Sequence, residues 1–321
     1  MYSQPWVVSS FFIYYEYIVL LYPRTASWPL MASPIPIVLI LGIYLYFVTS
    51  FGPIAMMDFK PFELKKTMLL YNAGQVVTCA YVVYKSFTLG WGGHYRMICE
   101  PIDYSYDERA VGMAKIVYIY MLLKLVDLLD TVFCVLRKKN SQITFLHVYH
   151  HMGMVGVGWA SAKYIPGGHG TMLGFLNSIV HMVMYSYYFL TLLDNNHKKS
   201  MWWKKHITQL QLLQFVLDLY HFSTVFMVSD CAYPWWPSML VIPQTITMII
   251  LFTDFYIKDY MKPTVKQADK EPKVTKAAME DFANKEENNP ILCIHSGDYP
   301  VPRQLRMKRT QKHLRKSVTL T

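Results

Sequence analysis

Three histidines lie within five residues of the sequence, at His147, His150 and His151. In an α-helix the positions i, i+3 and i+4 share one face, so these imidazole rings would crowd together. Imidazole can act as a nucleophile, as a proton donor or acceptor, and as a metal ligand. A single histidine in an apolar helix usually serves packing, whereas three on one face indicate catalysis or metal binding.

A second group of ionisable residues precedes the histidines. Lys124, Asp127, Asp130 and Thr131 follow one another at i, i+3, i+6 and i+7, which is again one helix face. Lys124 and Asp127 are one turn apart and can pair. The alternative to a functional role is a structural ion pair, in which each charge only compensates the cost of burying the other. Asp127 alone is enough to neutralise Lys124. We therefore expect the second carboxylate, Asp130, to orient another group.

Two further polar clusters follow, each with helical spacing. The third consists of Asn177, His181, Met184, Tyr185 and Tyr188, with Tyr187 beside them, and the fourth of Thr208, Gln211 and Gln214, followed by Asp218 and His221. Amide side chains at this spacing could donate hydrogen bonds to a carbonyl or an oxyanion. Hydrogen bonding between packed helices is the alternative for both clusters.

The elements that carry these clusters are recognised by their lack of charge. Only 16% of the 321 residues are charged and 53% are hydrophobic, and the mean hydropathy is +0.20. A membrane-spanning helix needs about 20 apolar residues. Five charge-free stretches approach or exceed that length, between positions 24 and 58, 66 and 85, 139 and 163, 163 and 194, and 230 and 254. Two more, 110–136 and 206–228, are apolar but contain charged members of the clusters. We therefore predict an all-α integral membrane protein with seven transmembrane helices, rather than a soluble protein with buried helices.

The distribution of lysine and arginine predicts the orientation, because cytosolic loops are enriched in these residues. With the N-terminus in the lumen, the three cytosolic connections hold ten basic residues and the lumenal side holds six. The chain then divides into a lumenal lead-in (1–33), a membrane domain (34–257) and a basic, mostly disordered cytosolic tail (258–321). The net charge of +10 reflects this bias or, in part, a site for a phosphate-bearing substrate. Nucleic acid is not expected, because the basic residues are split among loops.

The cysteines agree with this orientation. Cys99 and Cys231 fall in the two larger lumenal loops, where the compartment permits disulfides. We predict a bridge between them.

The clusters are expected at similar depth. At 1.5 Å per residue, Asp130 lies about 10 Å from the cytosolic edge and His181 about 20 Å. One intramembrane site that opens to the cytosol is therefore expected. A di-iron centre would need several histidine boxes, and this sequence has one, so no metal is predicted.

The order and spacing of these residues resemble the very-long-chain fatty acid elongase family. Its Lys-x-x-Glu-x-x-Asp-Thr motif is similar to the segment from Lys124 to Thr131, with Asp127 in place of glutamate. Its histidine box is His147-Val-Tyr-His150-His151. The segments Asn177–Tyr188 and Thr208–Gln214 match its Asn-x-x-x-His-x-x-Met-Tyr-x-Tyr-Tyr and Thr-x-x-Gln-x-x-Gln motifs. The resemblance covers about residues 22–262, and it assigns no role to Asp218.

The resemblance implies six helices in a barrel around an acyl tunnel, with the first helix outside. It implies an acyltransferase of the endoplasmic reticulum membrane, a 3-oxoacyl-CoA synthase that condenses acyl-CoA with malonyl-CoA and needs no cofactor. Its partners would be the bilayer and the reductases and dehydratase of the elongation cycle.

It also implies roles for individual residues. His150 would be the nucleophile, assisted by His147 and His151, and Asp130 would hold an imidazole tautomer. His181 would also be catalytic, stabilising the thioester oxyanion or the malonyl enolate. The substrate contacts would come from Lys124, Asp127, Asn177, Tyr187, Gln211 and Gln214, with Arg137, Lys204 and Lys205 on the CoA phosphates. The alternatives are a non-catalytic lipid-binding paralogue, a transporter, which should show internal repeats or broken helices, and a di-iron desaturase or hydroxylase.

Overall fold

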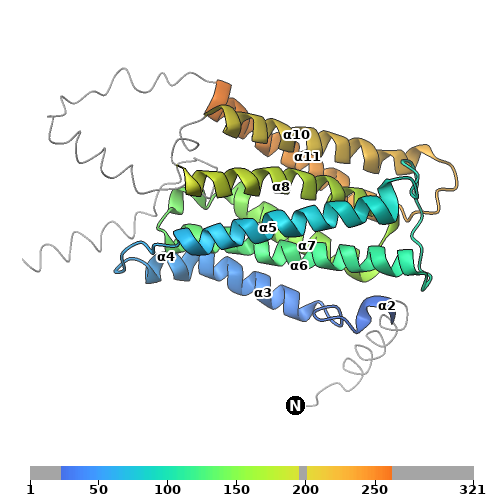
Figure 1. Cartoon of the computed structure of the whole chain (residues 1–321), viewed down its shortest axis with the longest axis horizontal. Helices are drawn as coiled ribbons and strands as arrows, with labels where there is room; N and C mark the ends of the chain where they lie inside the picture. The colour runs from blue at the N-terminus through green and yellow to red at the C-terminus, as the bar shows by residue number, and fades with distance from the viewer. Residues whose placement is uncertain (1–22, 195–200, 262–321) are drawn as a thin grey trace, which may run out of the picture.

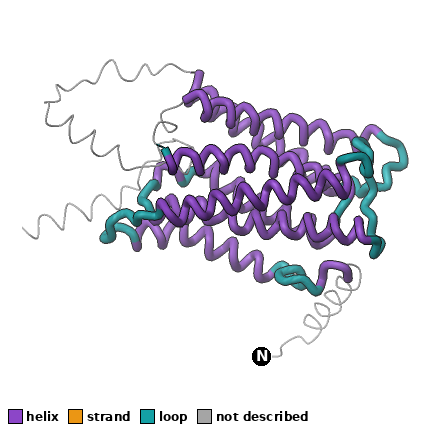
Figure 2. The backbone as a smooth tube through the Cα atoms, in the orientation of Figure 1, coloured by secondary structure: helices purple, strands orange, loops and turns teal. Residues whose placement is uncertain are grey.

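The computed structural model describes residues 23–194 and 201–261, and every regular element within these ranges is helical (Figures 1 and 2). The predicted lead-in up to residue 22 and the predicted tail beyond residue 261 lie outside the described residues. The all-α prediction is therefore confirmed for the part of the chain that the structure describes.

Long helices form on each of the stretches that the sequence predicts as spans. They are α3 (Ile35–Tyr46), continued by η1 (Phe47–Phe51) and α4 (Gly52–Ala55), then α5 (Lys65–Ser86), α6 (Glu108–Leu136), α7 (Phe145–Tyr164), α8 (Thr171–Leu193), α10 (Met201–Ser223) and α11 (Trp236–Tyr256). Shorter elements flank them: α2 (Pro23–Ala26), η2 (Phe87–Trp91), η3 (Asn140–Gln142), η4 (Gly168–Gly170), η5 (Thr224–Met227) and η6 (Ile257–Met261).

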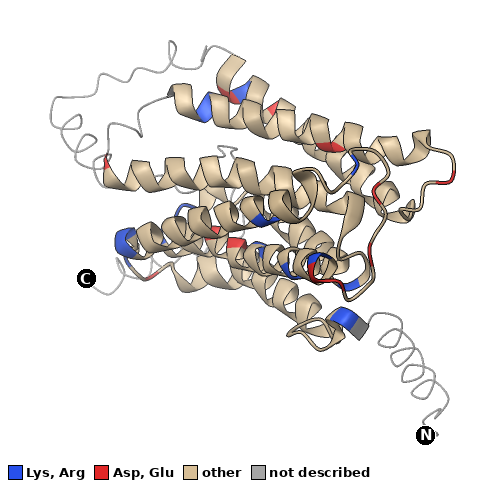
Figure 3. Cartoon of the chain, turned by 45° about the vertical axis from the view of Figure 1, so that its right-hand side comes forward, with Lys and Arg blue, Asp and Glu red and all other residues tan. Residues whose placement is uncertain are grey.

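Three of the described helical segments are long and apolar enough to cross a membrane on length and composition alone: Ile35–Ala55, Gly168–Leu193 and Trp236–Met261. The other long helices are less apolar, because α6, α7 and α10 carry three of the polar clusters. Charged residues are sparse along the helices and concentrate near their ends (Figure 3).

Apolar side chains cover the outside of the bundle. Ile35, Val38 and Ile43 on α3 are each at least 60% exposed, and α10 and α11 likewise expose leucine, valine and isoleucine. Lys124 and Asp127, in contrast, are at most 2% exposed. A soluble protein rarely exposes so much contiguous apolar surface, so this arrangement fits a hydrocarbon surrounding.

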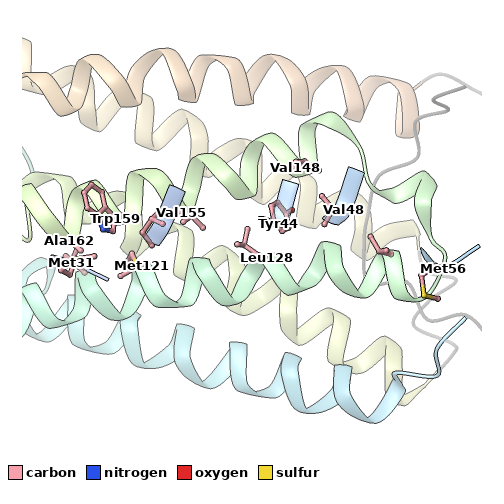
Figure 4. Packing of buried hydrophobic residues seen from close by; sticks show 13 residues of the cluster. Met31, Tyr44, Val48, Met56, Met121, Leu128, Val148, Val155, Trp159 and Ala162 are labelled. Carbon is pink, nitrogen blue, oxygen red and sulfur yellow. The ribbon is translucent and has the colours of Figure 1, made fainter. Parts of the chain in front are cut away.

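The helices pack along one another, with α5 beside α8, α6 beside α7, and α10 beside both α8 and α11. The segment α3–η1–α4 lies at one edge of the bundle (Figure 1) and contacts α6 and α7. Tyr44 and Val48 from this segment, Leu128 from α6, and Val148 and Val155 from α7 belong to one buried cluster (Figure 4). A hydrogen bond between the Tyr44 hydroxyl and Thr131 Oγ1, 2.7 Å long, fixes α3 against α6.

At one end of the bundle, two histidines close the space between η4 and α10. His169 and His221 stack with ring centroids 3.7 Å apart, and the Nε2 of each lies 3.0 Å from the carbonyl oxygen of the other. Because a carbonyl only accepts, both rings carry their proton on Nε2. The backbone N–H of His169 also donates to Glu100 O at 2.9 Å, so the loop before α6 is attached to the same end.

Candidate active site

The centre of the site is a buried ion pair on α6. Lys124 Nζ donates to Asp127 Oδ2 at 2.7 Å and to Asn177 Oδ1 on α8 at 2.9 Å. The pairing expected from the i, i+3 spacing is therefore present, and it joins α6 to α8. Buried ion pairs are tolerated only where further hydrogen bonds satisfy their remaining atoms.

Those further hydrogen bonds come from α5 and α8. Gln75 Nε2 donates to Asp127 Oδ1 at 2.9 Å. The Tyr185 hydroxyl lies between two carboxylates, 3.2 Å from Asp127 Oδ1 and 2.7 Å from Asp130 Oδ2. Tyr71 accepts from Gln75 Nε2 at 3.0 Å. Both oxygens of Asp127 are thus engaged, and three helices are linked through one carboxylate.

His181 completes this network. Its Nδ1 lies 3.4 Å from Lys124 Nζ and 3.6 Å from Asp127 Oδ2. An ammonium group only donates, so Nδ1 accepts and Nε2 carries the ring proton. The carboxylate beside this imidazole is that of Asp127, whereas Asp130 contacts the Tyr185 hydroxyl. The Lys124 ammonium therefore sets this tautomer of His181, and the tautomer-holding role expected for Asp130 stays a prediction.

The histidine box lies in the first two turns of α7. Thr144 caps the helix, its Oγ1 accepting from the backbone N–H of His147 at 3.2 Å. The ring centroids of His147 and His151 are 4.4 Å apart, and those of His150 and His151 are 5.6 Å apart. The rings crowd together as the spacing predicts.

One pocket brings the clusters together. It is lined by His150, Gly153, Met154 and Val157 of α7, Leu173 and Asn177 of α8, Gln214, Phe215 and Asp218 of α10, and Val241, Gln244, Thr245 and Met248 of α11. We call it the polar pocket. Lys124 does not line this pocket but is linked to it, because its Nζ donates to Asn177 Oδ1 at 2.9 Å.

A second, largely apolar pocket adjoins the first. It is lined mainly by residues of α5, α6, α7 and α8, among them Val82, Met113 and Ile116, and by Ile165, which follows α7. Val157 and Leu173 line both pockets, so the apolar pocket continues the polar one toward the end closed by His169 and His221.

Asn177 is fixed between these pockets. Its Oδ1 accepts from Lys124 and from the Tyr120 hydroxyl, each at 2.9 Å. These two donors determine which way the amide points. Its NH2 group makes no hydrogen bond to the described residues and remains able to donate.

Several predicted site residues lie elsewhere. Gln211 Nε2 contacts Met184 Sδ at 3.9 Å, and Tyr187 is buried in an apolar cluster with Phe133. Arg137 follows the end of α6, and Lys204 and Lys205 lie in the first turns of α10. None of these residues lines either pocket, so their contacts with substrate stay predictions.

The sequence did not single out Gln75, Tyr120, Tyr149 or Gln244. Tyr149 donates to Gln244 Oε1 at 2.5 Å, which connects α7 to α11 beside the polar pocket. Each of these is one polar residue without charge in an apolar stretch. The only signal in the sequence was a polar side chain within a predicted membrane span. A single such residue, with no polar neighbour at helical spacing, does not indicate a site.

Within residues 23–194 and 201–261, no three His, Cys, Asp or Glu side chains are grouped as a metal ion would require. The clusters on α6 and α8 are joined by hydrogen bonds, while His150, Asn177 and Gln214 from the other three motifs line one pocket.

The predicted bridge between Cys99 and Cys231 is present. A disulfide links Cys99 to Cys231 across 132 residues of sequence. Closing a loop of this length restricts the unfolded chain, so loss of the bridge typically costs about 2–5 kcal/mol.

We therefore expect the double variant Cys99→Ser/Cys231→Ser to lose about 3 kcal/mol of unfolding free energy in detergent. Non-reducing peptide mapping of the wild-type protein should recover the two cysteines in one cross-linked fragment. Alkylation of both thiols without reductant would contradict this prediction.

Similarity to known proteins extends over all four motif clusters. The family model for the GNS1/SUR4 (ELO) family matches residues 29–268. Very long chain fatty acid elongase 7 of Rattus norvegicus is 46% identical over 242 residues, which are 75% of this chain and 86% of the relative. Very long chain fatty acid elongase 7 of Drosophila melanogaster is 38% identical over 276 residues (86% and 81%). Very long chain fatty acid elongase 1 of Mus musculus is 39% identical over 270 residues (82% and 96%).

Proposed function

Because the chain belongs to the GNS1/SUR4 (ELO) family and is a fatty acid elongase, we propose that it is a very-long-chain 3-oxoacyl-CoA synthase of the endoplasmic reticulum. Its reaction converts a long acyl-CoA and malonyl-CoA into a 3-oxoacyl-CoA, CO2 and CoA. The observation that carries the proposal is that His150, Asn177 and Gln214 line one pocket, which the apolar pocket extends.

The first half of the reaction uses His150 as the nucleophile. An imidazole nitrogen attacks the thioester carbon, the carbon–sulfur bond breaks, and CoA leaves as its thiol with the imidazole proton. Splitting the condensation into two acyl transfers lowers the barrier of each. The Asn177 NH2 group is held so that it can donate to the thioester oxygen as negative charge develops there.

The second half forms the new carbon–carbon bond. Malonyl-CoA loses CO2, and the α-carbon of the resulting enolate attacks the acyl-imidazole carbon. The carbon–nitrogen bond breaks, and His150 regains its proton from water. Gln214 donates one N–H to Asp218 at 3.1 Å and retains a second, which suits the enolate oxygen. The His181 Nε2–H, set by the hydrogen bond from Lys124 to Nδ1, would be a third donor for this charge.

The same proposal covers the surroundings of the site. Seven spans, with α3 outside a barrel of the other six, are supported by the seven helical segments and the edge position of α3. A lumenal N-terminus and a cytosolic C-terminus are supported by the basic loops and by the disulfide, which needs an oxidising compartment. Arg137, Lys204 and Lys205 follow α6 or begin α10 on the basic side, where they suit the CoA phosphates. The acyl tail would occupy the apolar pocket.

The test is turnover by purified full-length protein. It is incubated with labelled malonyl-CoA and a panel of saturated and unsaturated acyl-CoAs, and products are resolved by chain length. Label is expected in 3-oxoacyl-CoA two carbons longer than the substrate, with one CO2 released per product. Binding of acyl-CoA without elongation of any member would instead support a non-catalytic lipid binder.

A further inference from the structure

Asp218 is a buried carboxyl group that the condensation does not use. It lies on α10, one turn beyond Gln214, and is 2% exposed. Its Oδ2 accepts from Gln214 Nε2 at 3.1 Å. Its Oδ1 is buried and has no hydrogen-bond partner among the residues that the structure describes.

Asp218 faces the polar pocket together with His150. The pocket is also lined by the apolar Phe215, Val241 and Met248 and by the polar Gln244 and Thr245, but none of these donates to Oδ1. A buried polar atom without a partner costs free energy. A plain alkyl chain in this pocket would leave Oδ1 unsatisfied and would displace any water that satisfied it.

The position of Asp218 places it along the path of an acyl chain. From His150, the polar pocket leads past Val157 and Leu173 into the apolar pocket. Four residues of helix separate Asp218 from Gln214, so Asp218 lies about 6 Å further along α10 toward the closed end. Carbons near the thioester end of a chain attached to His150 would therefore pass Asp218.

We propose that Asp218 is a specificity-determining residue that recognises a hydroxyl group on the acyl chain, so that hydroxylated acyl-CoAs are preferred substrates. A hydroxyl is both donor and acceptor, so it can pair with Oδ1 whether the carboxyl is ionised or protonated. This inference rests on the proposed elongase activity and names a substrate class for it.

The experiment compares acyl-CoAs of equal length that are plain or carry one hydroxyl, placed at successive carbons from the thioester. The kcat/KM of the wild-type protein is expected to favour one hydroxyl position by about tenfold over the plain chain, which corresponds to about 1.4 kcal/mol. In Asp218→Val that ratio should fall at least tenfold, beyond any loss that both substrates share because Gln214 loses its hydrogen-bond partner. Asp218→Asn keeps polar atoms there and should retain most of the preference.

The control is Asp254→Asn, since Asp254 is an exposed carboxylate of α11 paired with Lys258 at 2.6 Å. It should leave the ratio unchanged. The proposal is overturned if the wild-type protein prefers no hydroxyl position, or if Asp218→Val changes both substrates by the same factor, as it would if Asp218 only oriented Gln214 or held a water. If Asp218→Val does not fold, as judged by gel filtration, the wild-type preference and Asp218→Asn decide the outcome. Failure to elongate any acyl-CoA would refute the elongase activity itself, whereas elongation without hydroxyl preference refutes only this inference.

Discussion

Replacing His150 with alanine is expected to lower elongation by on the order of 10³-fold or more, because removing a nucleophile abolishes the covalent route. His150 is the one histidine among the described residues that lines the polar pocket. His147 and His151 lie on the same helix face but do not line that pocket, so they are not placed to substitute for it. The measurement is the initial rate of labelled malonyl-CoA incorporation by purified protein.

The half-reaction gives a sharper readout of the same prediction. With acyl-CoA and no malonyl-CoA, the wild-type protein should release up to one equivalent of CoA and acquire an acyl group on the peptide that contains His150. His150→Ala should show neither. His206→Ala is the matched control, because His206 is exposed and rests against Trp202 at the start of α10; it should keep wild-type turnover. Wild-type rates in His150→Ala would refute the acyl-histidine mechanism.

Substituting Lys124 with methionine is expected to cost about 3–5 kcal/mol of unfolding free energy, because it leaves the Asp127 carboxylate buried without its cation. The variant Lys124→Met/Asp127→Leu should recover part of that loss, since it removes both charges, but it should remain inactive. Unfolding in detergent, followed by loss of helical signal, measures both effects.

An exposed ion pair provides the comparison. Lys258 Nζ lies 2.6 Å from Asp254 Oδ2, close to the 2.7 Å of the buried pair, but both side chains are more than half exposed. Lys258→Met should therefore cost less than about 1 kcal/mol. If Lys124→Met and Lys258→Met lost equal unfolding free energy, burial would not be the reason that the Lys124–Asp127 pair stabilises the protein.

The helices were predictable because charge is expensive in hydrocarbon and its absence is visible in a sequence. The charge-free stretch between positions 66 and 85, for example, coincides with α5, Lys65–Ser86. The crowding of the histidine box followed equally directly from helical spacing. The position of a helix and the crowding of side chains on its face both depend on residues within that one helix.

Contacts between helices were not predictable in the same way. Asp127 is one methylene shorter than the glutamate of the family motif, and its partner geometry could not be inferred. The structure shows that Gln75 from α5 and Tyr185 from α8 reach it at 2.9 and 3.2 Å. Tyr187 is another case: its motif predicts a substrate contact, and the structure places it in a buried cluster that includes Phe133, so that contact stays a prediction.

The ion pair on α6 also bears on how the protein is made. Lys124, Asp127 and Asp130 lie within seven consecutive residues of one helix, and each would cost about 2.5–3.5 kcal/mol at the bilayer centre if inserted alone. Gln75 is synthesised before α6, but Asn177 and Tyr185 emerge only with α8. Insertion of α6 should therefore depend on helices translated after it, so a chain truncated before α8 should leave α6 outside the bilayer or held by the insertion machinery.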